Sequence, residues 1–492
     1  MDRNDENSAR IIKKIIFNIP MQTYSPLRIS SGVDDGITDI LVLKDKKGKA
    51  FIPGTSITGV LRAKMNNIYG DEAVNKLFGK IDDNNNQNVI NIEDSNDDNS
   101  NQSMINISDI VLENAKIINR DGIKIDPFTG VSKQGAKFDF EAIDKGATGD
   151  LYIEVTLRES FLSEQNKPNI SYRKEHKDFA INGDVYGELT ATIADILTEG
   201  INVGSLTTKG YGKIKSREPV KMYVFDFKNP QGAMKWWQYL NEGILQDVAY
   251  TGNKTVAVAS EKDFVMQMEF ALTSSMIIRD YDVDTDDEKE KIAAVQMKSG
   301  EDFVIPATSI KGVLKSRACK ILMNLNHHDE QKAEDFLDNL MGRETDKNNK
   351  EDKGQKSRLY IDEVYIKPNI LHSKKQSRNR IDRFTGGTID SALFTDKPIW
   401  QTDKSKATIA INLQVQNCDE KEAGLMLLVM KDLWLGDLAI GGNKAIGKGV
   451  LKGKKCTIQY AGESFLIQDD GDFHVSDNID KLEAYVQKLS GE

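Results

Sequence analysis

The chain carries one sequence pattern twice, and this duplication constrains its fold more than any other feature. Residues 51–64 read FIPGTSITGVLRAK, and residues 304–317 read VIPATSIKGVLKSR. In both copies a proline precedes a small residue, Thr-Ser-Ile, a glycine, Val-Leu and a basic residue. Because a repeat of long period marks a duplicated structural unit, we expect two similar domains in one polypeptide.

Four more blocks recur in the same order in both halves. They pair 77–79 (LFG) with 340–342 (LMG), 107–111 (ISDIV) with 361–364 (IDEV), 125–130 (IDPFTG) with 381–386 (IDRFTG), and 203–215 with 440–453, both rich in glycine. A shared order of five blocks is hard to obtain by chance. The duplication therefore covers most of the chain.

Composition limits the class of protein. The 492 residues are 39% hydrophobic and 29% charged, which is typical of a globular chain of two or three domains. No apolar run is long enough to cross a membrane, and the polar N-terminus lacks the pattern of a signal peptide. The cysteines, Cys319, Cys418 and Cys456, are too widely spaced for a metal site or a disulfide framework. We expect a cytoplasmic protein with no membrane partner.

The formal charge of −10 at first argues against a nucleic-acid partner. Acidic residues are, however, concentrated in segments 81–103, 282–290 and 344–353, whose composition is typical of solvated loops. Basic residues gather near the repeated motifs, and local clustering decides binding more than the net charge does.

Hydrophobic periodicity predicts the order of elements. Strands are expected at 10–19, where a helix is the alternative, and at 105–118, 149–157, 221–226, 265–272, 359–367 and 407–415. Helices are expected at 185–198, 232–243, 420–433 and 476–489. Residues 40–43 and 50–52 suggest a short hairpin. The pattern favours an α+β fold with a ferredoxin-like βαββαβ unit in each half. We expect a first domain at 1–225 with an Asn/Asp-rich insertion at about 80–104, a boundary region at 226–262, and a second domain at 263–492.

The repeated Pro-Gly/Ala-Thr-Ser turn predicts a helix start. Thr55 or Ser56 could cap a helix whose apolar stripe includes Ile57, Leu61 and Met65. The unpaired N–H groups of such a helix end can bind a phosphate. A plain helix cap is the alternative interpretation.

The glycine-rich segments allow either a binding loop or a structural turn. Glycine lets a backbone approach a ligand closely and adopt positive φ, and Lys209, Lys213, Lys444 and Lys448 lie among the glycines. Neither copy has the Gly-Lys-Ser/Thr ending of a Walker loop, which argues against an ATPase.

Two further segments are candidates for contact with RNA or metal. The Asp-x-Phe-Thr-Gly loops, at 126–130 and 382–386, indicate either a structured hairpin or an extended loop that touches RNA. Asp34, Asp35 and Asp39 follow the first strand and could hold a divalent metal, or could simply be solvated.

Together these blocks resemble the RAMP superfamily, specifically the backbone subunit of type III CRISPR effector complexes. The resemblance rests on the Ile-Pro-Gly-Thr-Ser-Ile turn, on Arg120-Asp121-Gly122 with Ile125-Asp126, and on the glycine-rich segments. The fused pair looks like the double-backbone proteins of type III-D systems. The resemblance implies ferredoxin-like (RRM-like) cores with inserted thumb hairpins. It also implies three partners: a CRISPR guide RNA, a complementary target RNA and other type III effector subunits.

The resemblance also implies roles for individual residues. Guide contacts would come from Gly54, Thr55, Ser56, Arg62, Lys64, Lys209, Gly210, Gly212, Lys213, Thr308, Ser309, Lys311, Lys315, Arg317, Lys444, Gly447 and Lys448. Thumb or target contacts would come from Arg120, Lys124, Phe128, Arg378, Arg380, Arg383 and Phe384.

The loop aspartate that supports metal-dependent cleavage of target RNA in the family corresponds best to Asp39, with Mg²⁺ or a similar divalent ion. The same distance before Pro306 falls on Ile292, next to Lys291, where there is no acid. We therefore expect the second domain to bind without cutting, unless Asp284, Asp286 or Asp287 compensates. Two alternatives stay open: a non-catalytic RNA-binding scaffold, and a guide-processing ribonuclease, which the scarcity of suitably placed histidine disfavours.

Overall fold

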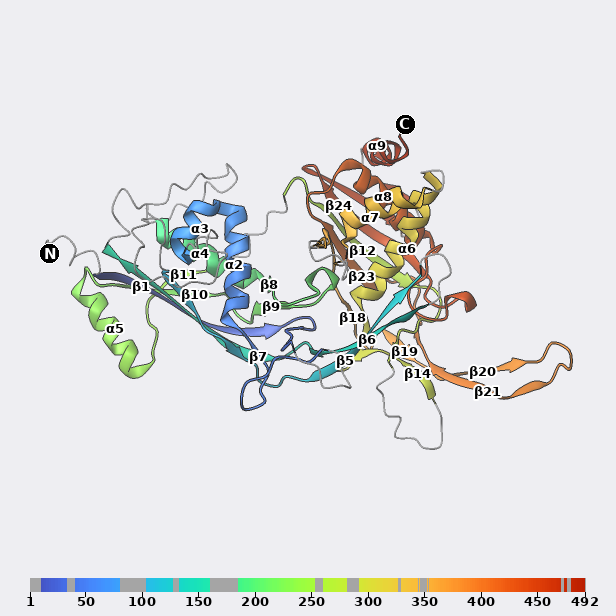
Figure 1. Cartoon of the computed structure of the whole chain (residues 1–492), viewed down its shortest axis with the longest axis horizontal. Coiled ribbons are helices and arrows are strands. Elements are labelled where there is room, and N and C mark those ends of the chain that lie inside the picture. The colour runs from blue at the N-terminus through green and yellow to red at the C-terminus, as the bar shows by residue number, and fades with distance from the viewer. Residues whose placement is uncertain are drawn as a thin grey trace. The chain divides into compact units, whose positions relative to one another are not determined.

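The computed structural model describes residues 10–32, 40–79, 103–126, 132–159, 185–252, 260–280, 292–325, 329–343, 345, 352, 354–469, 473–475 and 479–491. They form two compact units (Figure 1). Unit 1 comprises Met1–Ile118, Glu141–Ser205 and Gly212–Val258, and unit 2 comprises Asn119–Phe140, Leu206–Tyr211 and Ala259–Glu492. The units are not continuous stretches of chain, because two segments from the first half belong to unit 2.

Unit 1 is built on an antiparallel sheet with most of its helices on one face (Figure 1). The strands along the sheet are β11 (Val248–Thr251), β10 (Lys221–Asp226), β1 (Ile11–Thr23), β7 (Thr148–Arg158) and β3 (Ile105–Ile107), with β9 (Lys213–Ser216) beside β1 and β8 (Ile201–Asn202) beside β9. The covering helices are α2 (Gly54–Tyr69), α3 (Asp71–Phe78) and α4 (Val185–Glu199). The stretch 226–262 contains helix α5 (Pro230–Glu242) as well as β11, which extends the sheet by pairing with β10.

Unit 2 repeats this plan. Its sheet runs β17 (Leu359–Ile361), β23 (Ile409–Val415), β12 (Phe264–Leu272), β24 (Leu451–Tyr460), β25 (Glu463–Asp469) and β26 (Phe473–Val475). Its helices are α6 (Ala307–Leu325), α7 (Glu330–Met341), α8 (Glu420–Leu435) and α9 (Ile479–Ser490).

The chain order confirms the expected fold class. In unit 1 the sequence β1, α2, β3, β7, α4, β10 gives the spatial order β10-β1-β7-β3. In unit 2 the sequence β12, α6, β17, β23, α8, β24 gives β24-β12-β23-β17, which is the same order. Both are βαββαβ units of ferredoxin-like topology, so the predictions of an α+β fold and of two tandem units are confirmed.

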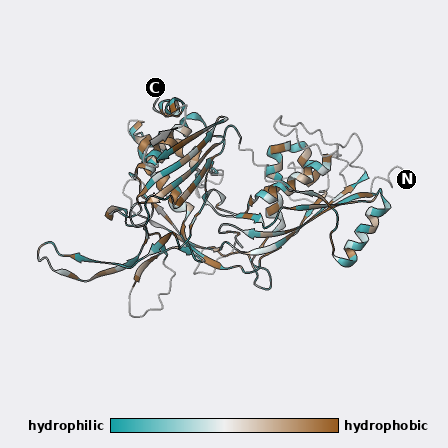
Figure 2. Ribbon diagram, turned by 180° about the vertical axis from the view of Figure 1, so that it is seen from behind, coloured by the Kyte–Doolittle hydropathy of each residue, from teal (hydrophilic) through white to brown (hydrophobic). Residues whose placement is uncertain are grey.

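The hydrophobic stripes predicted on the two repeated helices face the cores. On α2, Ile57, Leu61 and Met65 are fully buried, and on α6 Ile310 and Leu314 are too. Figure 2 shows hydrophobic colour along helices and strands of both units. Burial of such stripes against a sheet is the main source of stability for helices of this length.

One local expectation is wrong. Helix α2 begins at Gly54, so Thr55 and Ser56 lie in its first turn, and no side chain of the N-cap residue Pro53 caps it. The Asp109 carboxylate accepts a hydrogen bond from the Gly54 N–H at 2.7 Å instead. A residue distant in sequence therefore supplies the acceptor that the local pattern placed at Thr55 or Ser56.

Two hairpins are inserted at matching places between the second and third strands of the core motif. They are β5 (Ile117–Ile125) with β6 (Ser132–Ile143), and β20 (Gln376–Ile381) with β21 (Thr388–Lys397). The remaining elements are β2 (Phe51–Ile52), β4 (Ile110–Val111), β13 (Arg279–Asp280), β14 (Ile292–Gln296), β15 (Lys298–Ser299), β16 (Asp302–Ile305), β18 (Val364–Ile366), β19 (Leu371–Ser373), β22 (Ile399–Gln401), and the 3₁₀ turns η3 (Thr207–Lys209) and η4 (Lys444–Ile446).

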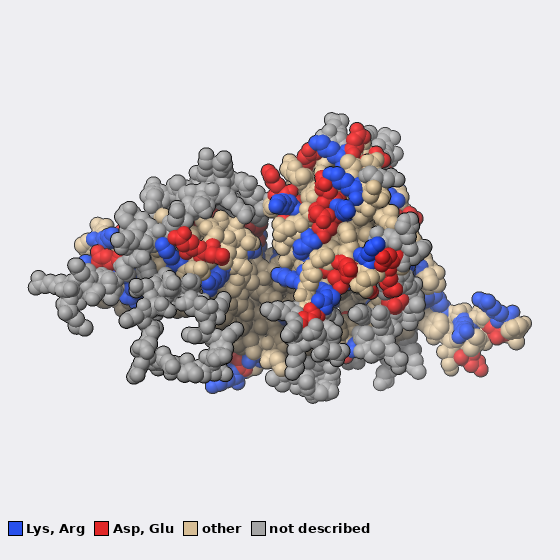
Figure 3. Space-filling view, turned by 45° about the horizontal axis from the view of Figure 1, so that its top comes forward, with Lys and Arg blue, Asp and Glu red and all other residues tan. Residues whose placement is uncertain are grey.

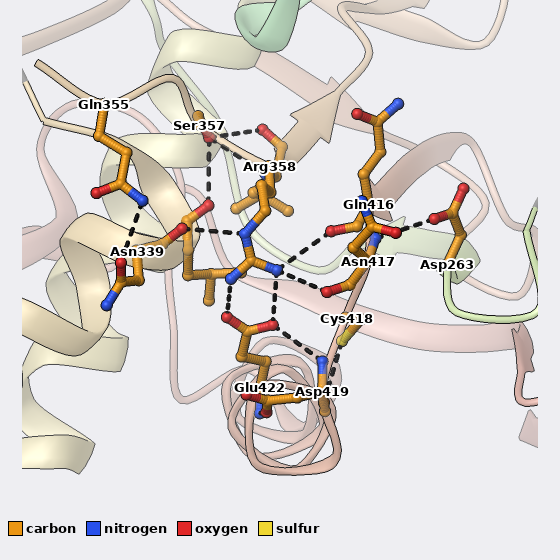
Figure 4. Close-up of polar contacts among 12 residues, drawn as sticks. Asp263, Asn339, Gln355, Ser357, Arg358, Gln416, Asn417, Cys418, Asp419 and Glu422 are labelled. Atoms are coloured by element: carbon orange, nitrogen blue, oxygen red, sulfur yellow. Dashed lines mark hydrogen bonds and ion pairs between the residues drawn. The ribbon is translucent and has the colours of Figure 1, made fainter. Parts of the chain in front are cut away.

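A polar network fixes the start of helix α8 in unit 2 (Figure 4). The Arg358 guanidinium donates to the carbonyl of Asn417 at 2.8 Å, to that of Asn339 at 3.1 Å, and to both oxygens of the Glu422 carboxylate. Glu422 also completes a capping box with Asp419. One arginine thus links the ends of α7 and β23 to the first turn of α8.

Within the described residues, no helix is long and apolar enough to span a membrane. The same residues hold no group of three or more His, Cys, Asp or Glu side chains arranged for a metal ion. The acidic segments expected to be loops lie almost entirely outside the described residues.

Candidate nucleic-acid interface

The two glycine-rich segments fold into the same turn. Leu206 and Asn443 both adopt left-handed backbone, with φ of 60° and 59°. Gly210 and Gly447 follow with φ of 81° and 80°. This conformation favours glycine, which explains why the spacing of the glycines is the same in both copies.

A second glycine in each turn is required by packing. A Cβ atom on Gly212 would lie 2.0 Å from the Val203 carbonyl oxygen, and one on Gly449 would lie 1.9 Å from the Ile440 carbonyl oxygen. These glycines are therefore needed for the turn itself. The structural interpretation accounts for the glycines without a ligand.

The surroundings of the two turns differ. A Cβ atom on Gly210 would lie 2.8 Å from both the Ala307 Cβ and the Glu363 backbone nitrogen, all within unit 2. A Cβ atom on Gly447 would meet nothing within 4 Å in the described part of the chain. Residues 444–447 are exposed, whereas residues 207–210 are buried or half-buried.

The repeated helix starts present hydroxyl groups at the surface. Thr55 and Thr308 are exposed, and Ser56 and Ser309 are partly exposed. At the start of α2, the Asp109 carboxylate already accepts a hydrogen bond from the Gly54 N–H. Its charge stabilises the positive end of the helix and would repel a phosphate there.

The lysines next to these helix starts are engaged internally. The Lys64 ammonium donates to the Gly200 carbonyl at 3.1 Å, and burial lowers its pKa. Lys311 is 6% exposed and donates to Ser357 Oγ at 2.7 Å, to the Leu359 carbonyl at 2.8 Å and to the Thr208 carbonyl at 3.4 Å. Burial, helped by the nearby charges of Lys209 and Lys315, lowers the pKa of Lys311 to about 7.

Three other basic residues expected at the guide also have partners within the protein. Arg62 donates to Asn75 Oδ1 at 2.5 Å, Arg317 pairs with Asp432 at 2.6 Å, and Lys315 lies 3.9 Å from the Asp338 carboxylate. Arg62, Lys315 and Arg317 remain partly exposed. Lys213 is exposed, and Lys209 is half-buried in turn η3.

The first hairpin is anchored at Arg120. This residue is 5% exposed, and its guanidinium lies 3.6 Å from the Glu363 carboxylate, which is also buried. Glu363 in turn accepts a hydrogen bond from the Tyr365 hydroxyl at 2.8 Å. Sequence reasoning missed Glu363, although it aligns with Asp109 in the repeated block. The Lys124 side chain and Phe128 lie outside the described residues.

The base of the second hairpin is held by a buried carboxylate. Asp396 is 2% exposed and pairs with Arg378, and its Oδ2 accepts from Asn443 Nδ2 at 3.2 Å. Lys448, also 2% exposed, donates to Gln376 Oε1 at 2.7 Å and lies 3.9 Å from Asp396. Asn443 and Lys448 thus connect the hairpin to the second glycine-rich turn, and Arg378 ties the two strands of the hairpin together.

The tip of the second hairpin is ordered and exposed. The Asp382 carboxylate accepts from the Phe384 N–H at 2.9 Å and the Thr385 N–H at 2.8 Å, and these bonds lower the pKa of Asp382. Phe384 is 99% exposed, and Arg380 and Arg383 are exposed beside it. The second loop is therefore a structured hairpin with an exposed tip, and its contact with RNA stays a prediction, while most of the first loop lies outside the described residues.

Charge on this hairpin is predominantly positive. Residues 374–397 include six basic and three acidic residues. Asp396 is buried in its ion pairs, and Asp382 is occupied by the turn. Figure 3 shows Lys and Arg side chains on the projecting hairpin at the right of the view. An exposed aromatic ring flanked by arginines is suited to stacking on a base and contacting phosphates.

Asp39 lies outside the described residues, as do Asp34 and Asp35. Its neighbour Ile40 accepts a backbone hydrogen bond from Glu141 at 2.9 Å, and Leu41 accepts one from Ser31 at 3.1 Å. The metal role of Asp39 stays a prediction, as do the RNA contacts assigned to the other residues.

Comparison with known proteins identifies the family. The model of the RAMP superfamily matches residues 21–215 and 269–452, one region in each half. No curated protein matches the sequence. Among matching solved structures, a chain of "Cryo-EM structure of the Type III-B Cmr-beta bound to cognate target RNA" is 15% identical, with a TM-score of 0.29. That match covers 44% of this chain and 61% of the other. Since the family regions span well over half of its length, this chain belongs to the RAMP superfamily and contains two copies of the family's domain.

Proposed function

We propose that this chain is a guide-RNA-binding backbone subunit of a type III CRISPR effector complex, and that it cleaves complementary target RNA through Asp39. The observation that carries the proposal is the presence of two RAMP regions with the repeated motifs in one order. The exposed, basic second hairpin with Phe384 at its tip supports contact with RNA.

The second hairpin offers two kinds of contact. Arg380 and Arg383 would pair with phosphates, which gives affinity without sequence preference. Phe384 would stack on a base, a contact worth about 1–3 kcal/mol in other RNA-binding proteins. Base pairing with a guide would then supply the sequence specificity, as it does in DNA-targeting guide complexes.

The proposed cleavage uses the RNA's own nucleophile. The 2′-oxygen attacks the adjacent phosphorus while the bond to the 5′-oxygen breaks, leaving a cyclic phosphate and a 5′-hydroxyl end. A divalent cation held with the help of Asp39 would stabilise the charge that develops on the phosphate. An aspartate of ordinary pKa is too weak a base at neutral pH to be the main proton acceptor.

The test of cleavage compares Asp39 with two aspartates that lie close to it in the sequence. The protein is assembled with its neighbouring subunits and a guide, and labelled complementary RNA is added with Mg²⁺. Asp39→Ala should lose one cut while target binding is retained, and Asp34→Ala and Asp35→Ala serve as matched controls. Identical products from wild type and Asp39→Ala would favour a non-catalytic scaffold. Cleavage of precursor guide RNA by the protein alone would favour a processing ribonuclease.

Two further measurements separate the steps. A 2′-deoxy substitution 5′ of the scissile phosphate should abolish the cut, because it removes the nucleophile. Phe384→Ala should weaken RNA binding by about 1–3 kcal/mol with an unchanged salt dependence. Arg383→Ala should lower the slope of log K against log salt by about one. If both variants bind RNA as wild type does, the tip of the second hairpin does not contact the RNA.

A further inference from the structure

The segment that follows Asp39 is fixed on one side by the chain that precedes it. Asp39 itself lies outside the described residues, whereas the residues after it are described. The Leu41 carbonyl accepts a hydrogen bond from the Ser31 N–H at 3.1 Å, and the Leu43 N–H donates to the Ile29 carbonyl at 2.9 Å. These bonds set the register of the segment along its neighbour.

Glu141, near the end of β6, fixes the other side with both its backbone and its side chain. Its N–H donates to the Ile40 carbonyl at 2.9 Å, and its carboxylate oxygen Oε2 accepts from the Val42 N–H at 3.0 Å. The Glu141 side chain is only 16% exposed. The Lys44 ammonium lies 3.7 Å from the same oxygen, and its side chain is 41% exposed. Since an exposed ion pair contributes little, the hydrogen bond to Val42 is the stronger constraint.

The second repeat shows which residue corresponds to Glu141. In each repeat an isoleucine forms a β-bridge with the fourth residue after the first strand of the sheet. The two bridges are Leu27–Ile143 and Met276–Ile399. The residue two positions before the isoleucine is Glu141 in the first repeat and Lys397 in the second. The acid of the first repeat is therefore replaced by a base in the second.

The same comparison places an alanine at the position of Asp39. Leu43 and Met297 correspond, because each donates a backbone hydrogen bond to the second residue after the bridge, at 2.9 and 2.8 Å. Asp39 lies four residues before Leu43, and the residue four before Met297 is Ala293, which is exposed. This is one residue after Ile292, the position reached by sequence distance alone. The second repeat has an acid at neither position.

The second repeat holds its segment by regular strand pairing instead. Strand β14 runs parallel to β21, and Val295 lies opposite Lys397. The ammonium group of Lys397 cannot accept a hydrogen bond. In the first repeat, residues 40–44 form isolated bridges rather than a strand. The Glu141 carboxylate thus replaces part of a backbone ladder, and it does so in the repeat that has Asp39.

We propose that Glu141 is a positioning residue for cleavage, which holds the backbone after Asp39 and thereby sets where the Asp39 carboxylate lies. The inference rests on the proposed function, because without cleavage at Asp39 the bond from Val42 would serve the fold alone. Glu141 acts through the backbone and not on the RNA. A displacement of about 1 Å in a reacting group can lower a rate by about 100-fold, so a single hydrogen bond next to Asp39 can matter.

The test is a series of three substitutions in the complex assembled with its guide, Mg²⁺ and labelled complementary RNA. Glu141→Gln keeps an oxygen acceptor at the same reach, Glu141→Asp keeps the charge but shortens the reach, and Glu141→Ala removes both. Single-turnover rates with the complex in excess separate cutting from binding. We expect Glu141→Gln to cut within about threefold of wild type and the other two about 10-fold to 100-fold more slowly, with unchanged target affinity.

Hydrogen exchange of residues 40–44 gives a readout that does not depend on cleavage. Exchange there should become faster in Glu141→Asp and Glu141→Ala and stay close to wild type in Glu141→Gln, because only the amide oxygen of glutamine still reaches Val42. Glu113→Ala is the matched control, since Glu113 is an exposed glutamate of the same unit. It should change neither the cutting rate nor the exchange of residues 40–44.

The outcomes separate this proposal from the proposed function. Equal loss of cutting in Glu141→Gln and Glu141→Ala would show that the charge is needed rather than the hydrogen bond, and would overturn the positioning role. Wild-type cutting by Glu141→Ala, where Asp39→Ala has lost its cut, would also overturn it and leave the proposed function standing. If Asp39→Ala keeps every cut, both proposals are wrong.

Discussion

The pair Gly210 and Gly447 allows the packing of the first turn to be measured against a control in the same molecule. Both residues have φ near +80°, so alanine at either position costs about 1–2 kcal/mol in backbone strain. Only at Gly210 would the new Cβ atom lie 2.8 Å from Ala307 Cβ and from the Glu363 nitrogen. Overpacking of this kind typically costs a further ~1–3 kcal/mol. We therefore expect Gly210→Ala to reduce the stability of the folded protein by ~1–3 kcal/mol more than Gly447→Ala does.

Hydrogen exchange read by mass spectrometry reports the effect locally. Gly210→Ala should speed exchange in residues 203–216 and also in 305–315 and 357–366. The reason is that turn η3 would detach from the start of α6 and from β17. Gly447→Ala should speed exchange in residues 440–452 alone. A difference of ~1–3 kcal/mol corresponds to roughly fivefold to 150-fold in local opening. Equal effects of the two substitutions, or no response in 357–366, would refute the reasoning.

Three other perturbations have defined outcomes. In the folded protein Lys311 is neutral above its pKa of about 7, whereas in the unfolded protein it stays protonated up to about pH 10. Between these two pH values the unfolded state therefore binds more protons than the folded state, and stability rises with pH. Urea titrations should show wild type gaining stability over Lys311→Met by up to about 1.4 kcal/mol per pH unit in that window; a flat difference would contradict the burial of the amine. Arg358→Ala leaves Glu422 buried without its ionic partner and should cost about 3–5 kcal/mol in denaturation, whereas a loss below about 1 kcal/mol would show the pair to be solvated. Gly453→Ala places a Cβ atom 1.9 Å from the Trp434 ring and should lower the melting temperature and change the tryptophan emission; unaltered emission would argue against that contact.

The sequence predicted the core architecture well because periodicity and duplication report on burial. The strand at 221–226 agrees with β10, and the helix at 420–433 agrees with α8 to within two residues. The short helices α3 and α7 were missed. They are only eight and twelve residues long, and each ends at a glycine, Gly79 or Gly342, shortly before an acidic segment that was assigned to a loop.

Side-chain roles were harder to predict than elements. Lys311 was grouped with surface charges because it follows Thr-Ser-Ile on a helix, yet it is buried by a turn about a hundred residues earlier in the chain. Arg120 pairs with Glu363, far away in sequence. Local pattern contains no information about such distant partners. The alignment of Glu363 with Asp109 in the repeat was the one available signal. It indicates that an acid at this position is needed for the structure of both units.

The interleaving of the two repeats determines how this protein can be dissected. A fragment beginning near residue 263 would lack Asn119–Phe140 and Leu206–Tyr211, which complete unit 2. Glu363 would lose Arg120, and Lys311 would lose the Thr208 carbonyl, so both polar groups would be left in a surface shaped to be covered. Separate expression of the halves would therefore compare two damaged proteins, and the function of each repeat is better assigned by point substitution in the intact chain.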